Sequence, residues 1–220
     1  MRITYEMIQN NPDINTYITQ ADASLIAMGF TEHSFAHVTK CANVASKLLR
    51  DLGYSEREQE LAKIAGYMHD IGNVVNREDH AQSGAIMAFR LLDKLGMDAS
   101  DIAAVVTAIG NHDEHTAFPV NAISAALILA DKTDVRRSRV RNRDTINFDI
   151  HDRVNYAVER SDVTLDRERG TITLALTINT QVCAVMDYFE IFLTRMLLCR
   201  KAAEFFHLSF KLDINGVNVL

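Results

Sequence analysis

Hydrophobic residues recur every three or four positions through about the first two thirds of the chain, a spacing that predicts amphipathic helices. The expected helices lie at about residues 14–29, 34–53, 55–72, 80–95 and 101–112. Ser55 and Glu58 have the spacing of a capping box, which marks the start of the third helix. The run from Asn121 to Ala130 is apolar on nearly all sides, so we expect a central helix that its neighbours bury.

Near the C-terminus the hydrophobic period changes to two, which predicts strands. The expected elements are two strands, a long helix and a terminal hairpin, at about residues 162–165, 171–178, 180–206 and 207–220. The pair Asn215-Gly216 is the turn signal of that hairpin. We therefore expect a mainly α protein, with a helical domain at residues 1–160 and a small ββαββ subdomain at 161–220. Residues 146–160 form either a further helix or the joint between them.

The composition is that of an ordinary globular protein, with 48% hydrophobic and 24% charged residues. The 23 basic and 29 acidic side chains give a net charge of −6, so the chain as a whole repels polymeric nucleic acid and anionic membranes. We expect neither as a partner.

Cysteine usage and the apolar segments bear on the cellular compartment. The three cysteines lie far apart and outside any CxxC pair, which predicts a reduced, cytoplasmic protein. The start of the chain has no basic and apolar leader, so we expect no signal peptide. The apolar stretch at 182–206 carries several charged residues, which predicts a soluble helix and not a membrane span.

Metal-ligating side chains occupy positions where the helical period predicts apolar contact. His37 begins an apolar stripe, His112 ends another, and Asp131 ends the most hydrophobic segment. The pair His69-Asp70 follows an apolar helix. Burying such groups without partners costs several kcal/mol, so each is paired, metal-bound or near the surface. The alternatives are therefore a polar network within the core and a metal site, and local departures from pattern are expected at functional sites.

Together these motifs resemble the HD-domain metal-dependent phosphohydrolase superfamily over about residues 30–140. The matching segments are SFAHVTKCANVA around His37, AGYMHDIGN around His69 and Asp70, HAQSGA from His80, AIGNHDE around His112 and LADKTD around Asp131. The histidine of HAQSGA is similar to the HxxxG histidine of ribonuclease Y-like HD domains. The RNA-binding module that accompanies ribonuclease Y is missing from this sequence.

The resemblance implies a set of metal ligands. One divalent ion would be held by His37, His69, Asp70 and Asp131, and a second by His80 and His112 with Asp70 bridging. For His80 a plain helix-start residue is the alternative. Imidazole and carboxylate donors suit one or two ions of Mn, Fe, Co, Ni or Zn, and suit Mg less well.

The implied reaction is hydrolysis of a phosphoester by a metal-activated water, as a phosphomonoesterase or phosphodiesterase. Asn73 stands where many members have lysine, which removes one phosphate contact. Asp113 stands where a second histidine is frequent, and no GYP motif is present, which disfavours the cyclic-di-GMP branch. We expect a small, nucleotide-like phosphorylated substrate. The alternative is a non-catalytic metal- or nucleotide-binding HD module that acts as a sensor or oligomeric scaffold.

A basic run follows Asp131, with Lys132 and then five arginines among residues 136–143. If the helix that carries Asp131 continues, Arg136 comes close enough to contact a phosphate on the metals. The alternative is a solvated helix face. The predicted catalytic residues are thus Asp70, Lys132 and Arg136, with Arg137 as a further phosphate contact. The ββαββ subdomain has no catalytic motif, and homodimer formation and a lid over the site are equal alternatives for it.

Overall fold

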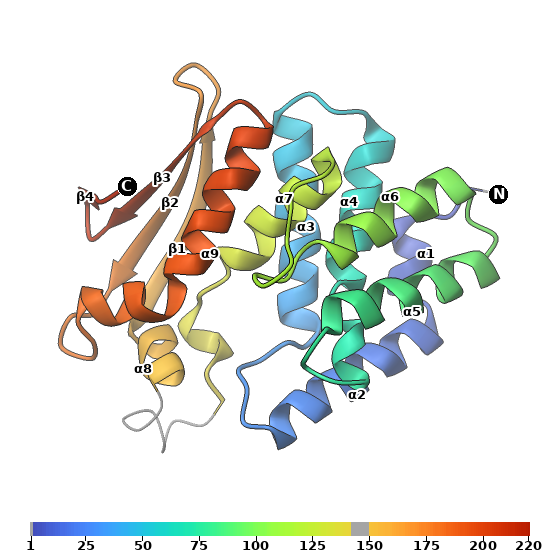
Figure 1. Ribbon diagram of the computed structural model, residues 1–220, viewed down its shortest axis with the longest axis horizontal. Coiled ribbons are helices and arrows are strands. Elements are labelled where there is room, and N and C mark those ends of the chain that lie inside the picture. The colour runs from blue at the N-terminus through green and yellow to red at the C-terminus, as the bar shows by residue number, and fades with distance from the viewer. Residues whose placement is uncertain (1, 142–149) are drawn as a thin grey trace. The chain divides into compact units, whose positions relative to one another are not determined.

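The computed structural model describes residues 2–141 and 150–220 (Figure 1). The contacts between residues divide the chain into two compact units, residues 1–131 and residues 132–220. We call them the helical unit and the sheet unit. The division lies earlier in the chain than the expected boundary at residue 160. The reason is that the segment after Asp131 and the helix before the first strand pack with the sheet.

The helical unit consists of helices in close contact, as expected for the first part of the chain. They are α1 (Tyr5–Gln9), α2 (Pro12–Ala27), α3 (Phe35–Asp51), α4 (Glu56–Met68), the 3-10 helix η1 (Ile71–Val74), α5 (His80–Lys94), α6 (Ala99–Gly110) and α7 (Ala122–Lys132). The capping box is confirmed, because Ser55 Oγ accepts from the Glu58 amide and Ser55 N–H donates to Glu58 Oε2. The expected end of α4 at Gly72 is wrong, since α4 stops at Met68 and a 3-10 turn follows.

The pairing of α3 with α4 organises the helical unit (Figure 1). A Cβ at Gly66 would lie 2.7 Å from the Cα and amide nitrogen of Ala42, so glycine permits the two backbones to approach. The interior of α7 is fully buried, including Leu127, Ile128 and Leu129, which confirms the central helix. The close packing of α3 on α4 places the start of α3 beside the end of α4.

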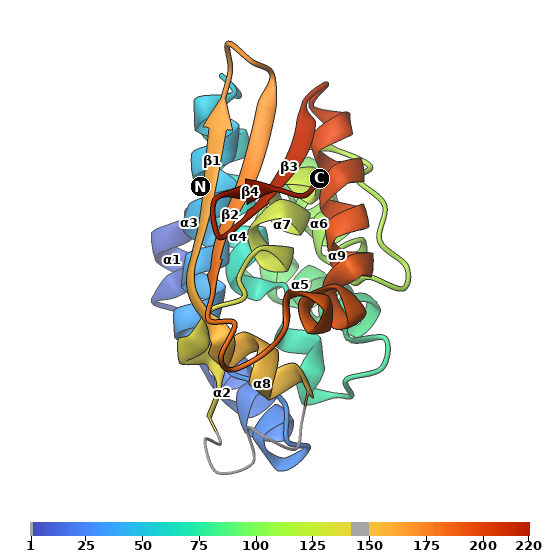
Figure 2. The ribbon, with the colours of Figure 1, turned by 90° about the vertical axis from the view of Figure 1, so that its left-hand side faces the viewer.

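The sheet unit has the expected ββαββ order. It contains η2 (Arg137–Arg139), α8 (Ile150–Ala157), β1 (Val158–Asp166), β2 (Thr171–Ile178), α9 (Val185–Phe205), β3 (Ser209–Ile214) and β4 (Val217–Asn218). The strand order is β1-β2-β3-β4, with β2 and β3 parallel and the outer pairs antiparallel (Figure 2). The helix predicted within 146–160 is α8, and residues 146–149 lie outside the described part of the chain.

The core of the sheet unit lies between α9 and one face of β2 and β3. On that face the neighbouring pairs Ile172–Phe210, Leu174–Leu212 and Leu176–Ile214 are buried. The α9 helix buries Tyr188, Phe192, Met196, Cys199 and Ala203, which share one face at helical spacing. The crossover through α9 therefore joins two parallel strands and covers them.

Two further expectations concern thiols and membranes. Within the described residues the thiols of Cys41, Cys183 and Cys199 are buried and form no disulfide. In the same part of the chain, no helix combines the length and apolar character that crossing a membrane requires.

Candidate metal centre

All six predicted metal ligands lie in the helical unit, at the ends of its elements. His37 is in the first turn of α3, His69 and Asp70 join α4 to η1, His80 begins α5, His112 follows α6, and Asp131 is in the last turn of α7. Each is 9% exposed or less. The structure therefore brings together residues that lie up to 94 positions apart, from 37 to 131.

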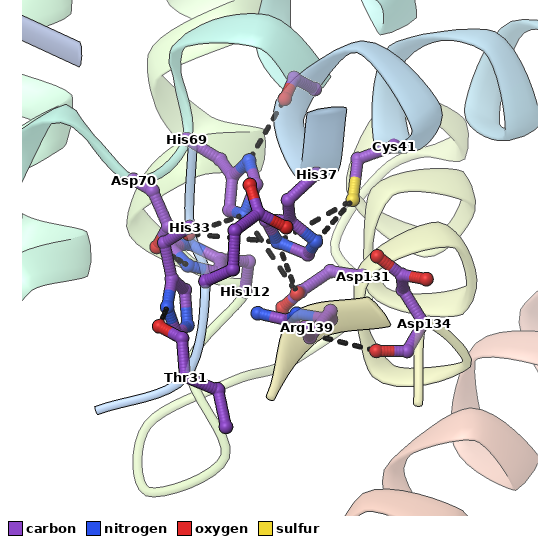
Figure 3. Close-up of polar contacts among 12 residues, drawn as sticks. Thr31, His33, His37, Cys41, His69, Asp70, His112, Asp131, Asp134 and Arg139 are labelled. Carbon is purple, nitrogen blue, oxygen red and sulfur yellow. Dashed lines mark hydrogen bonds and ion pairs between the residues drawn. The ribbon is translucent and has the colours of Figure 1, made fainter. Parts of the chain in front are cut away.

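A first pair of imidazoles faces both carboxylates (Figure 3). His37 Nε2 lies 3.6 Å from Asp70 Oδ2 and 3.3 Å from Asp131 Oδ1. His69 Nε2 lies 3.2 Å from Asp70 Oδ2 and 3.8 Å from Asp131 Oδ1. The four side chains thus surround one point with two nitrogens and two oxygens.

A second pair of imidazoles faces the other oxygen of Asp70. His80 Nε2 and His112 Nε2 are 3.2 Å apart, and they lie 3.6 Å and 3.9 Å from Asp70 Oδ1. Asp70 therefore presents Oδ2 to His37 and His69, and Oδ1 to His80 and His112. This is the arrangement that a bridging carboxylate requires.

Backbone carbonyls orient three of the four rings. The Nδ1 atoms of His69, His80 and His112 lie 2.8, 3.0 and 2.6 Å from the carbonyl oxygens of Gly66, Arg77 and Ile109. A carbonyl oxygen only accepts, so each Nδ1 carries the proton and donates. Each Nε2 then points to the centre, and such outer hydrogen bonds fix metal-binding histidines in other proteins.

The unsatisfied atoms of the centre fit a divalent cation. Among the described residues, His69 Nε2 and Asp70 Oδ2 are buried and have no hydrogen-bond partner. Leaving such a group unsatisfied costs about 1–3 kcal/mol, and a cation between them removes that cost. Donor atoms of His69, Asp70 and His112 lie within 4.8 Å of one another, as metal ligation requires.

Comparison with known proteins shows the family. The sequence profile of the HD domain family matches residues 34–191. The chain belongs to this family. The HD domain is similar to the uncharacterized protein MJ1020 of Methanocaldococcus jannaschii, with 23% identity over 185 residues that cover 74% of this chain and 71% of that protein. It is also similar to the crystal structure of a predicted HD superfamily hydrolase from an uncultured Thermotogales bacterium, with 28% identity, a TM-score of 0.45, and coverage of 56% of this chain and 67% of that one.

Charges within the centre of this HD domain oppose the effect of burial. Burial alone would lower the pKa of His69, but the carboxylates of Asp70 and Asp131 outweigh it and raise this pKa to about 10. Burial alone would raise the pKa of Asp70, yet its interactions with His69, His33 and His80 hold this pKa well below the ordinary value. Without a cation, His69 Nε2 and Asp70 Oδ2 lie 3.2 Å apart as an ion-pair contact without a hydrogen bond, and a metal at His69 Nε2 would take the place of the proton.

Two glycines explain how His80 reaches Asp70. A Cβ at Gly72 would lie 2.0 Å from the carbonyl oxygen of His80 and 2.5 Å from the amide nitrogen of Gly84. A Cβ at Gly84 would lie 3.2 Å from the amide nitrogen of Gly72 and from the carbonyl oxygen of His69. The glycines of HDIG and of HAQSG thus allow α5 to lie directly against the turn that carries Asp70.

Arg77, which no motif predicts, places a cation beside the centre. Asn73 Nδ2 donates to Asp70 Oδ1 at 3.0 Å, and Asn73 Oδ1 accepts from Arg77 Nη1 at 3.2 Å. Arg77 Nη1 also lies 3.5 Å from His80 Nε2, and the guanidinium lies 5.6 Å from the centre of the Phe30 ring. The available signal was a single basic residue in the loop between two ligand motifs. Asn73, which was read as a lost phosphate contact, holds both Asp70 and Arg77.

The basic run after Asp131 does not continue α7, and its residues Arg137–Arg139 form the 3-10 helix η2. The α7 helix ends at Lys132, a residue that is 4% exposed, so Arg136 is not on a continuation of that helix. Arg136 donates to the Asp134 carboxylate from Nε and Nη2, at 2.5 and 2.9 Å. Arg139 is 4% exposed and donates to the Asp134 carbonyl at 2.7 Å. Arg137 donates to the Tyr156 carbonyl and stacks on its ring, so these arginines pack the sheet unit.

Proposed function

We propose that the chain is a metal-dependent phosphohydrolase that cleaves a small, nucleotide-like phosphorylated substrate. The observation that carries the proposal is Asp70, whose two oxygens each face a separate pair of imidazoles. When bound at such a centre, divalent ions activate a water molecule and polarise the phosphoryl group. Membership of the HD domain family supports a hydrolase.

The six residues of the centre have distinct proposed roles. His37, His69 and Asp131 would hold one ion, His80 and His112 would hold the other, and Asp70 would contribute one oxygen to each. The hydrogen bonds from the Nδ1 atoms keep the Nε2 atoms aimed at the ions before they bind. Their donor types favour Mn, Fe, Co, Ni or Zn over Mg.

Arg77 is the proposed phosphate contact. Its guanidinium lies within 3.5 Å of His80 Nε2, and Phe30 and Asn73 support it on two sides. A guanidinium matches two phosphate oxygens at once, so Arg77 takes the role of the lysine that Asn73 replaces. Lys132 remains a second candidate because it directly follows Asp131 on α7. Arg136 is a weaker candidate, because its Nε and Nη2 already donate to the Asp134 carboxylate.

The test combines metal analysis with turnover. The purified chain is loaded with Mn, Co, Ni or Mg and offered nucleoside mono-, di- and triphosphates, cyclic nucleotides and dinucleoside polyphosphates. Hydrolysis in isotope-labelled water is expected to place the label on the phosphate product, because water attacks phosphorus. Label found only on the alcohol product would refute that attack. Stoichiometric metal without turnover on any substrate would favour the non-catalytic sensor or scaffold instead.

A further inference from the structure

Cys41 lies next to the centre. It follows His37 by four residues on α3, so both side chains point from the same face of that helix (Figure 3). The Cys41 side chain is fully buried, and its Sγ is 3.7 Å from both Nδ1 and Nε2 of His37. The thiol therefore faces the imidazole that ligates the first ion in the proposed function.

Four donor atoms form a compact group at this position. They come from His37, Cys41, His69 and Asp131, and all lie within 4.8 Å of one another. In a tetrahedral zinc site, bonds of roughly 2.0–2.3 Å put neighbouring donor atoms about 3.3–3.8 Å apart. The pairs His37–Asp131, Cys41–His37 and His69–Asp131 are separated by 3.3, 3.7 and 3.8 Å. These three separations fall within that range.

A second observation points independently to a ligand here. His69 is fully buried, and its Nε2 has no hydrogen-bond partner among the described residues. That ring cannot turn away, because its Nδ1 is held by the Gly66 carbonyl. This nitrogen lies 3.2 Å from Asp70 Oδ2 and 3.8 Å from Asp131 Oδ1 without a hydrogen bond, and its residue belongs to the same donor group as Cys41.

We infer that Cys41 is a metal ligand, so that His37, Cys41, His69 and Asp131 form, together with the bridging Asp70, a thiolate-containing site for Zn²⁺ or Co²⁺. The inference rests on the metal centre of the proposed function and adds a ligand to it. On binding, sulfur forms a bond to the ion and the thiol proton passes to solvent, with no change of oxidation state. Thiolate is a soft ligand, so this site disfavours Mg²⁺ and Mn²⁺.

The two ions would then have different roles. With Cys41 bound and Asp70 bridging, the first ion would have five protein donors and no position for substrate, whereas three protein ligands leave a position open for substrate. The second group has three protein donors, His80, His112 and Asp70. The thiolate site would thus anchor the centre, and the second site would receive the phosphoryl group beside Arg77.

Cobalt spectroscopy tests this ligand directly, because a thiolate bound to Co²⁺ gives a charge-transfer absorption in the near ultraviolet. The chain has three cysteines, so the double variant Cys183→Ala/Cys199→Ala keeps only Cys41. Both replaced residues belong to the sheet unit. The metal-free wild type and this double variant are each titrated with Co²⁺, and bound metal is counted by elemental analysis. We expect the thiolate band in both proteins, and Cys41→Ser should lack it.

Cys41→Ser should also bind Zn²⁺ at least about tenfold more weakly in competition with a chelator, with Mn²⁺ affinity almost unchanged. If Co²⁺ binds the double variant stoichiometrically without a thiolate band, Cys41 is not a ligand and the inference is overturned. That result does not depend on the folding of Cys41→Ser. Phosphoester turnover without the band would overturn the inference and leave the proposed function standing. The thiolate band without any turnover would support Cys41 as a ligand and count against the proposed function.

Discussion

Replacing Gly72 by alanine tests whether contact between the HD turn and α5 assembles the metal centre. The new Cβ would lie 2.0 Å from the His80 carbonyl oxygen, 2.5 Å from the Gly84 amide nitrogen and 2.7 Å from Ser83 Oγ. The two shortest contacts are to backbone, so no side-chain rotation relieves them. To restore a separation of 3.0 Å from 2.0 Å, α5 must move away by about 1 Å.

The expected loss in the free energy of unfolding is large for the addition of a single methyl group. Overpacking a core typically costs about 1–3 kcal/mol, and two backbone contacts this short place Gly72→Ala at about 3 kcal/mol or more. His80 moves with α5, away from Asp70 Oδ1 at 3.6 Å and His112 Nε2 at 3.2 Å. We therefore expect the second ion to bind about tenfold more weakly or worse.

Urea unfolding of the metal-free protein measures the stability change, and elemental analysis measures metal content. Two variants provide a graded control. Gly84→Ala meets atoms at 3.2 Å and should cost about 1 kcal/mol. Gly110→Ala meets only Ala85 Cβ at 3.6 Å, so it should be neutral or stabilise by up to about 0.5 kcal/mol. If Gly72→Ala matches the wild type in stability and metal content, the proposed role of this close contact is refuted.

Three further predictions concern the ligands and the cation. His80→Ala and His112→Ala should each lower metal content from about two ions toward one, as native mass spectrometry can show, and unchanged stoichiometry would mean a mononuclear site. Since the pKa of His69 is about 10 without metal, a proton competes with the ion below that pH. Zn²⁺ affinity should therefore rise up to about tenfold per pH unit in chelator competition from pH ~6.5 to 8.5, and a flat profile would contradict the His69 assignment. Arg77→Ala should lower kcat/KM about ten- to a hundredfold with metal content unchanged, whereas the exposed Arg90→Ala should match wild type; equal activity of both variants would exclude Arg77 as the phosphate contact.

Much of this protein is determined by local sequence. Periodicity and capping act over a few residues, so α2 to α7, α9, the ββαββ order and the start of α4 at its Ser55 cap were predictable, whereas the short α1 was not. The HD motif likewise identified the family, because its residues recur with their local context. The ends of elements were less predictable. The α4 helix stops before Gly72, where the turn packs against α5, and the run after Lys132 leaves the helix because its arginines bind within the sheet unit.

Only the tertiary structure decided how the candidate ligands are used. The two oxygens of Asp70 face different imidazole pairs because α3, α5 and α6, which come from separate parts of the sequence, each bring a histidine to it. The same packing brings Arg77 over Phe30 and sets Cys41 beside His37 within reach of His69. Sequence spacing predicts which residues are neighbours along one helix. Contacts between residues of different helices depend instead on how those helices pack. Gly72 permits two backbones to lie close together, so its importance is visible only in the folded chain.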